Sequence, residues 1–490
     1  MRRTAHRCCI AALCAAPAAA QAHSFGRLYN LPVPLWMYLY GAAAALLLSF
    51  LIVGYFLKAP VAAAARAGRD LGDSGWVKLL RRLRLLYWLK GLSVLGLLLC
   101  MLTGFLGNRD PYRNFNMTFF WVVFMLGFSY LSAVLGDLYA AINPWRVIAA
   151  MLERGIRGYS RGRWRYPPAL AYWPALGFYM AFIWIELFVF NRPLSLAVML
   201  AVYSAINLLG VWLIGGSAWF RYCEFLSVFL RLIARMAPFD YWPAERAGAR
   251  GSLRWRMPFA GVIEDRADSW SLLLFVLFML SSTAFDGLHA TAPWFKLFWA
   301  DPLGLVRPWV GKPPIMAYAT LRPYYVVWES LCLLLSPFLY LGFYLLFIAL
   351  AKLLSRSRRT LRELALTFAF SLLPIALVYN ITHYYTLLLS QGVMMVSLLS
   401  DPFGLGWNLF GTAGLLRAPI LPAMGLVWHS QVGLILFGHI VSVCLAHVEA
   451  LRMFPSRRQA LLSQIPMLFL MVCFTAAGLW ILAQPIAAGG

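Results

Sequence analysis

Residues 35–57 read LWMYLYGAAAALLLSFLIVGYFL and contain no charged side chain. A run of about 20 apolar residues is long enough for a helix to cross the hydrocarbon core of a bilayer. Nine further stretches of comparable length and composition follow along the chain. The sequence therefore predicts an all-α fold, a polytopic bundle of about ten transmembrane helices. These helices are expected at 35–57, 86–106, 117–141, 169–190, 194–218, 270–291, 324–350, 364–389, 426–449 and 464–484.

The overall composition excludes both a soluble globular protein and a disordered chain. Of the 490 residues, 62% are hydrophobic and 12% are charged, whereas soluble domains carry about 25% charged residues. Disordered chains contain few aromatic residues, but 16% of this chain is aromatic. The formal net charge of +24 would suit a nucleic-acid partner, so the positions of the basic residues must decide between that partner and a membrane.

The first 22 residues resemble a secretory signal peptide. Three arginines lie within the first seven residues, a short apolar stretch covers 8–16, and an A-x-A sequence stands at 20–22. This is the pattern of a signal that is cleaved after export, and an uncleaved anchor is the alternative. Cleavage would leave 23–490 as a single multi-span domain whose first residue, His23, lies outside the cytoplasm.

The basic residues alternate between the two sides of the membrane. Thirty of the 42 Lys and Arg residues fall in the loops after the first, third, fifth, seventh and ninth spans, nine fall on the other side and three in the signal. Loops rich in Lys and Arg stay in the cytoplasm. The pattern predicts both mature termini outside a bacterial inner membrane, with the lipid bilayer rather than nucleic acid as the partner.

Two kinds of non-spanning segment stand out. Residues 221–239 alternate arginines with apolar residues, which predicts an interfacial cytoplasmic segment within 220–262. The outer loops 292–323 and 390–425 are long and rich in aromatic residues, Pro and Gly, and are expected to cover the outer face. The five cysteines outside the signal form no CxxC pair and are interpreted as small apolar residues.

Ionisable residues inside spans are costly, and they often mark functional sites. The direction of each span gives these residues a depth in the membrane, at about 1.5 Å of rise per residue. His439 lies near the middle, and Asp137 and His447 lie at the inner end. The outer half receives Glu186, Asp286, His289, Glu329, His383 and His429.

The outer set predicts a metal or proton-handling site. Asp286 and His289 are three residues apart and share a helix face, and carboxylates and imidazoles are the usual ligands of zinc and similar divalent ions. The alternative is that these residues pair structurally or cap helix ends. The expected metal ligands are Asp286, His289, His383 and His439, with Glu186, Glu329 and His429 orienting the ligand imidazoles.

Two further histidines carry separate interpretations. His23, as a mature N-terminus, would offer an amine and an imidazole that chelate copper together, or it is simply a flexible residue at the signal junction. His447 lies too deep for the outer set and is expected to be structural.

Several blocks of sequence are similar to a known family. The mature chain resembles, from end to end, bacterial multi-span membrane proteins known as fenitrothion hydrolases. The resemblance rests on the opening HSFGRLYNLPVPLW at 23–36, on SDPFG at 400–404, on GHIV at 438–441, on LAH at 445–447 and on SQIPM at 463–467.

The resemblance implies a hydrolase that cleaves the P–O–aryl bond of an apolar organophosphate triester and releases a nitrophenol. Such hydrolysis is commonly metal-assisted, because a metal-bound water is deprotonated near neutral pH. Asp286 and His383 are the expected catalytic residues, with Asp286 orienting or deprotonating the water. No serine-hydrolase elbow, HExxH motif or nucleotide-binding loop occurs in the sequence.

Two other classes of function stay open. A transporter or metal-handling protein would use the same intramembrane residues, with Asn207 and Asp137 extending a path inward. A structural subunit without chemistry would tolerate every histidine substitution. A second membrane subunit or a homo-oligomer is a possible partner in each case.

Overall fold

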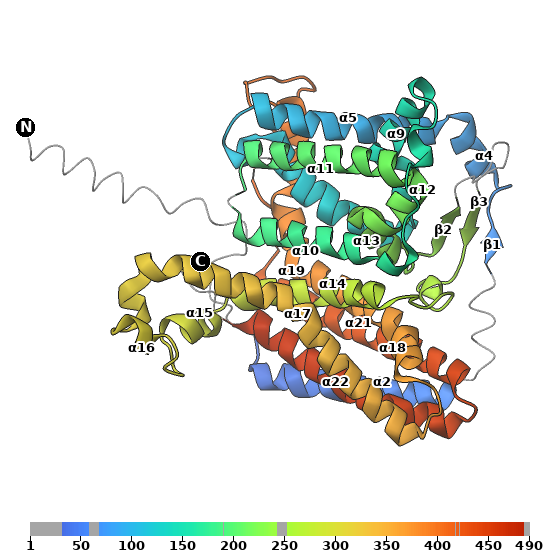
Figure 1. Cartoon of the computed structure of the whole chain (residues 1–490), viewed down its shortest axis with the longest axis vertical. Coiled ribbons are helices and arrows are strands. Elements are labelled where there is room, and N and C mark those ends of the chain that lie inside the picture. The colour runs from blue at the N-terminus through green and yellow to red at the C-terminus, as the bar shows by residue number, and fades with distance from the viewer. Residues whose placement is uncertain are drawn as a thin grey trace, which may run out of the picture.

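The chain folds into a bundle of long helices, most of which run along a common direction (Figure 1). The computed structural model describes residues 32–57, 68–189, 191–242, 252–416, 418–420 and 422–484. Within these residues, ten helical segments are long and apolar enough to cross a membrane. The predicted all-α, polytopic membrane bundle is therefore confirmed. The signal peptide and His23 lie outside the described residues.

The ten segments follow the expected order along the chain, and four are clearly longer than predicted. The seventh and eighth run for 42 and 40 residues, and the ninth and tenth for 30 and 27. One α-helix supplies 38 residues of the seventh, and in the eighth short turns of 3₁₀ helix link successive α-helices. The segments are α2 (Leu35–Phe56), α5 (Leu85–Leu106), Phe115–Leu135 with α6 (Phe115–Met117), the π-helix η2 (Thr118–Phe128) and α7 (Ser129–Leu135), Pro168–Phe188 with α10 (Trp173–Phe188), α11 (Pro193–Ile214), α14 (Trp270–His289), Pro314–Ser355 with α17 (Tyr318–Ser355), Leu361–Ser400 with α18 (Leu361–Phe368), α19 (Leu373–Ser390) and α20 (Met395–Ser400), α21 (Met424–Met453) and α22 (Arg457–Ala483).

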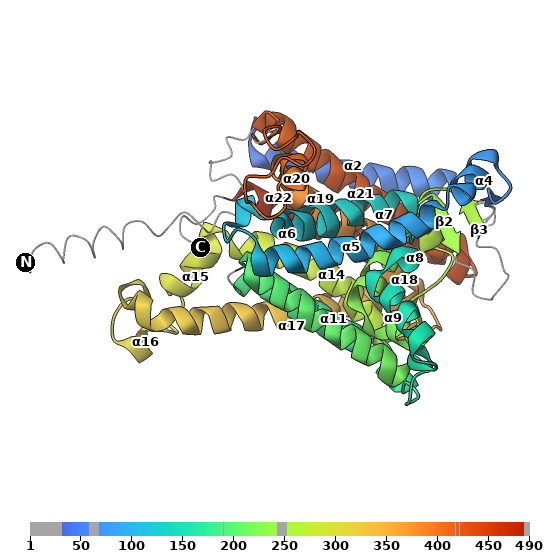
Figure 2. The ribbon, with the colours of Figure 1, turned by 90° about the horizontal axis from the view of Figure 1, so that it is seen from above.

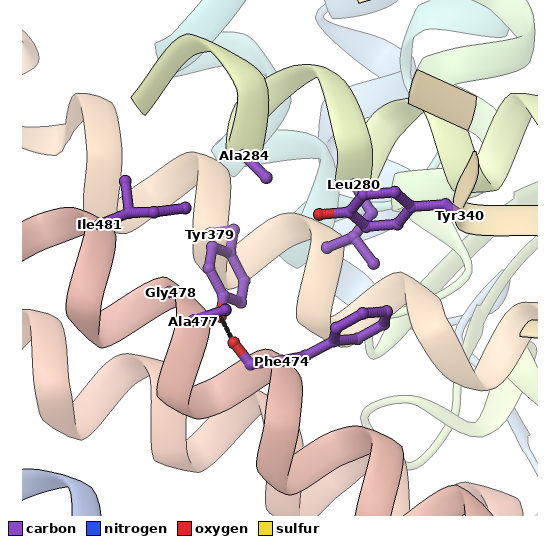
Figure 3. A pocket seen from close by; sticks show the side chains of 8 residues that line it. All are labelled: Leu280, Ala284, Tyr340, Tyr379, Phe474, Ala477, Gly478 and Ile481. Carbon is purple, nitrogen blue, oxygen red and sulfur yellow. Dashed lines mark hydrogen bonds between the residues drawn. The ribbon is translucent and has the colours of Figure 1, made fainter. Parts of the chain in front are cut away.

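Shorter elements close the two ends of the bundle. The end that carries the strands is called the sheet end, and the end that carries α15 and α16 is called the hook end (Figures 1 and 2). The charge pattern predicts that the sheet end faces the cytoplasm. The sheet end includes β1 (Arg69–Asp70), β2 (Phe239–Trp242), β3 (Ser252–Trp255), α4 (Gly75–Arg82), α8 (Tyr139–Ile142), α9 (Pro144–Gly155), α12 (Gly216–Ala218), the π-helix η5 (Trp219–Cys223) and α13 (Phe225–Ala234), and the hook end α15 (Ala292–Trp299) and α16 (Arg307–Val310).

Two helices form the centre of the bundle. In their most apolar windows, 78% of the residues of α14 and 89% of those in Leu361–Ser400 are buried, against 17% for α2. A helix that is apolar on every side must be surrounded by protein or lipid, and here other helices surround α14 and α19. Side chains at the ends of these helices are therefore held by a well-packed core.

A small antiparallel sheet in the order β1–β3–β2 stands at the sheet end. Arg254 on β3 donates to Asp240 on β2 at 3.0 Å and to Glu264 at 2.8 Å. This ion-pair network joins the strand pair to Glu264, and so fixes the connection that leads into α14.

The helix within the segment expected at the membrane interface is mostly buried in the protein. Nine of the ten residues of α13 are buried, and Glu224 caps the helix by accepting from the backbone N–H groups of Leu226 and Ser227. Protein therefore surrounds most of α13, and the helix has no broad apolar face left for lipid.

Candidate functional site around Asp286

Asp286 is the centre of the most connected group of ionisable side chains at the hook end. It lies in the last turn of α14 and is 2% exposed. Its Oδ1 lies 3.3 Å from His289 Nε2, and its Oδ2 lies 2.9 Å from His383 Nε2. The hydroxyl of Tyr384 also donates to Oδ2. One buried carboxylate thus meets three side chains that can each carry a proton.

The local sequence explains how these groups meet. Asp286 and His289 are three residues apart on α14, so they share a helix face. His383 comes from α19, which packs closely against α14. Gly287 permits the close approach of α22, because a Cβ there would lie 2.9 Å from Ile481 Cγ2, whereas His383 Cε1 at 3.6 Å would be in ordinary contact. A larger residue would displace the Ile481 side chain.

A second buried carboxylate lies on the other side of His289. Glu329 on α17 is 6% exposed, and its Oε1 lies 3.7 Å from His289 Nδ1. The same oxygen accepts a hydrogen bond from Trp294 Nε1 at 3.0 Å. The imidazole of His289 therefore stands between the carboxylates of Asp286 and Glu329, and three helices contribute to one charged cluster.

Aromatic rings form the wall of the cluster. Phe285 stacks on His289 with ring centroids 5.5 Å apart, and Trp294 stacks on Trp328 at 4.6 Å. The side chains of His289 and His383 are each 21% exposed, whereas that of Asp286 is 2% exposed. A molecule arriving from outside can therefore contact the imidazoles but not the carboxylate that binds them.

His439, the fourth expected metal ligand, lies apart from this cluster. It is fully buried on α21, and its Nδ1–H donates to the backbone oxygen of Ile435 at 2.8 Å. Its ring meets Tyr379 edge-on at 5.9 Å, and Tyr379 is one turn before His383 on α19. Its Nε2 has no hydrogen-bond partner among the described residues. His439 is thus one layer deeper than His383.

The residues expected to orient the ligands divide into two groups. Glu329 contacts His289 as described, and Glu186 on α10 lies within electrostatic reach of Tyr384. His429 instead lies on the exposed side of α21, where its Nδ1–H donates to Gly425 O at 2.6 Å and its Nε2 lies 3.3 Å from the Tyr38 hydroxyl. Glu329 therefore belongs to the cluster around Asp286, Glu186 lies near it, and His429 has other neighbours.

The remaining polar residues are held by local hydrogen bonds. His447 is fully buried and bonds through Nδ1 to Gln464. Asn207 accepts from Trp219 Nε1 at 2.7 Å, and Asp137 accepts from the backbone N–H of Ala140 at 3.0 Å. The cysteines in the described part of the chain are all free.

The carboxylates and imidazoles of the cluster are ligand types that a divalent metal prefers. Whether they are arranged to bind one ion depends on their geometry. Among the described residues, no group of three or more His, Cys, Asp or Glu side chains is arranged to hold a metal ion. The divalent metal therefore stays a prediction from the residue types, and the chemistry proposed below uses only the side chains themselves.

The sequence did not identify two contributors to the cluster. Tyr384 follows His383 directly, and its position beside an expected site residue was the only signal for it. Trp294 bonds to Glu329 from a loop helix 35 residues away, and nothing in the sequence links these two positions. Tertiary packing alone reveals that contact.

Comparison of the chain with protein-family models, with curated proteins and with solved structures gives no match in any of the three.

Proposed function

We propose that this chain is a membrane-embedded hydrolase, with its reacting groups at Asp286 and His383. The observation that carries the proposal is the 2.9 Å contact between the buried carboxylate of Asp286 and Nε2 of the partly exposed His383. A carboxylate that fixes one nitrogen of an imidazole leaves the other nitrogen to act as a base, which is the recurring logic of carboxylate–histidine pairs in hydrolases.

The proposed step is attack of water on a phosphotriester. Asp286 accepts the Nε2–H of His383, so Nδ1 carries the lone pair and takes a proton from the water. The water oxygen forms a bond to phosphorus while the P–O–aryl bond breaks, and the aryl group leaves as a phenolate. Tyr384, which also donates to Asp286, holds the carboxylate in place.

The substrate class comes from the resemblance to fenitrothion hydrolases and from the surroundings of the site. An apolar triester partitions into the bilayer, and the rings of Phe285, Trp294 and Trp328 present an apolar wall beside the imidazoles. These rings suit an aryl leaving group, because aromatic pairs gain about 0.5–1.5 kcal/mol beyond the area they bury.

A transporter is the second candidate, and buried polar groups on α21 favour it. His439 and His447 are fully buried, and neither Nε2 atom has a hydrogen-bond partner among the described residues. Unpaired buried polar atoms often mark an ordered water or a bound ion. These groups would extend a polar route from the cluster around Asp286 toward the sheet end.

The test is turnover of a nitrophenyl phosphotriester by the purified protein in nanodiscs, followed by nitrophenolate absorbance. We expect the wild-type protein to hydrolyse the triester. The rate should fall at least about a hundredfold in His383→Gln, since a general base accelerates such a reaction 10²–10⁴-fold. Metal content measured on the same samples checks the predicted divalent ion. Full activity in His383→Gln would contradict the proposal.

A matched pair of tyrosines provides the control. Tyr384 bonds to Asp286, whereas its neighbour Tyr385 bonds to Ser430 at 2.7 Å. Tyr384→Phe should lower turnover about tenfold, and Tyr385→Phe should leave it unchanged. Absence of turnover in the wild type, together with proton- or metal-coupled uptake into proteoliposomes, would favour the transporter instead.

A further inference from the structure

The short helix α4 at the sheet end carries an exposed apolar stripe. Trp76, Leu79 and Leu83 are 47%, 54% and 59% exposed. At about 100° per residue, these side chains project within one narrow arc of the helix. No described part of the protein covers this stripe, although its side chains are among the most costly to leave in water.

The opposite face of the same helix is basic. Lys78, Arg81 and Arg82 are exposed. At about 100° per residue, Lys78 and Arg81 project away from the apolar stripe, and Arg82 flanks it. Lys78 forms a 3.5 Å ion pair with Asp73 across the surface, and such exposed pairs contribute little energy. Arg84 follows two residues after the end of the helix. The helix therefore combines an apolar face and a strongly basic face within eight residues.

The surrounding elements fix the position of α4. Val77 is the one buried side chain of the helix. Just before α4, the N–H of Leu71 donates to Leu253 O at 2.8 Å, which ties the segment to β3. Just after it, α5 begins at Leu85, and both figures place α4 at the sheet end of α5 (Figures 1 and 2). α4 thus lies at the sheet end of the bundle, directly before the start of α5.

The exposed stripe continues onto α5. Tyr87 and Trp88 in its first turn are 72% and 75% exposed, and Leu92, Leu95 and Leu102 further along are 61%, 58% and 48% exposed. Exposed leucines on a spanning helix face lipid tails, and exposed Trp and Tyr at its end mark the headgroup level. The apolar stripe of α4 therefore begins where the lipid-facing surface of α5 ends.

We propose that α4 lies flat in the membrane surface at the sheet end and binds anionic phospholipid. Its apolar stripe enters the boundary between headgroups and acyl chains, and Lys78, Arg81 and Arg82 contact lipid phosphates. Helices of this composition lie in the interface plane. Each Lys or Arg near an anionic membrane surface raises the affinity for that surface about fivefold. The continuity with α5 and the complementary charge select a lipid rather than a protein partner.

The first experiment measures the depth of the two faces. A fluorescent label is placed at Leu79→Cys or at Arg81→Cys, in a full-length background where Cys332, Cys444 and Cys473 are serine. Nanodiscs contain lipids with a nitroxide on the acyl chain. We expect strong quenching of the label at 79 and weak quenching at 81. Weak quenching at both positions would overturn the proposal and indicate that another protein covers the stripe.

The second experiment measures the preference for charge. The label at 79 is quenched in nanodiscs by nitroxide-labelled phosphatidylglycerol or, at equal content, by nitroxide-labelled phosphatidylcholine. We expect several-fold stronger quenching by the anionic lipid. The preference should vanish in Lys78→Gln/Arg81→Gln/Arg82→Gln and persist in the control Arg109→Gln/Lys312→Gln, whose charges lie at the hook end. If the two labelled lipids quench equally in the unaltered chain and in the control variant, the proposal of anionic-lipid binding is overturned.

Discussion

Two buried carboxylates lie at opposite ends of the bundle and have different partners. Asp286 at the hook end meets two imidazoles and a phenol. Glu224 at the sheet end is fully buried and accepts from the backbone N–H groups of Leu226 and Ser227. Burial is equal in the two cases, so burial alone does not distinguish a reactive site from a structural one.

The chemistry of the partners makes the distinction. Glu224 also accepts from Tyr203 at 2.6 Å and from Asn143 Nδ2 at 3.3 Å, so both its oxygens are occupied by donors inside the protein. The partners of Asp286 include His289 and His383, whose rings are partly exposed. Asp286 can therefore act on a molecule outside the protein through the imidazoles that it binds, whereas Glu224 stabilises the start of α13.

The largest effect is expected for Asp286→Asn. The amide keeps the shape of the side chain but no longer fixes His383 as a base, so turnover of the triester should fall by roughly a thousandfold. Thermal unfolding should change little, because Asn still forms hydrogen bonds. Turnover within threefold of wild type would place the reaction elsewhere.

Glu224→Ala should have the opposite profile. It removes the helix cap, worth about 1 kcal/mol, and leaves Tyr203 without its buried acceptor, at about 1–3 kcal/mol for that unpaired group. Asn143 Nδ2 keeps its hydrogen bond to Ser227 Oγ at 3.3 Å. We expect a loss of about 3 kcal/mol in unfolding free energy, measured by denaturant or thermal unfolding in detergent. Turnover per folded molecule should stay at the wild-type level, and a selective loss of turnover would make the sheet end part of the site.

His439→Leu sharpens the boundary of the site. The substitution removes the unpaired Nε2 and also the bond from Nδ1 to Ile435, and these two effects oppose each other. Unfolding free energy should therefore change by less than about 1 kcal/mol, and turnover should be retained. A loss of both turnover and bound metal would instead support His439 as a metal ligand.

The smallest effect concerns pH. Burial raises the pKa of the Glu224 carboxyl above its ordinary value, so the folded state keeps a proton that the unfolded state releases. Stability should fall as pH rises from the ordinary glutamate pKa through the raised one. Glu224→Gln should reduce this slope in unfolding measured at several pH values. An unchanged slope would show that another group causes this pH dependence of stability.

The sequence predicted the helices well because long apolar stretches have few alternatives to spanning helices. It also predicted that Asp286, His289 and His383 lie at one end of the bundle, since helix direction converts residue number into depth. Depth gives no rotation about the helix axis, however. His429 and His383 are both predicted in the outer half of the membrane, but His429 is exposed and bonds to Tyr38, so only packing separates them.

The two amphipathic helices at the sheet end show the same limit. Residues 221–239 alternate charge and apolarity, but α13 is buried because the π-helix η5 and the Glu224 cap turn it into the bundle. α4 carries a similar pattern in eight residues and stays exposed. Amphipathic composition is therefore compatible with both environments, and the neighbouring elements decide between them.

The central claim is that Asp286 and His383 act as one unit, and a double-mutant cycle on triester turnover tests it most directly. The variants are Asp286→Asn, His383→Gln and the two combined, each in nanodiscs. Residues that act together lose activity non-additively, so we predict that the double variant is no slower than the slower single variant. Losses that multiply would show that the two residues act independently and would contradict the account.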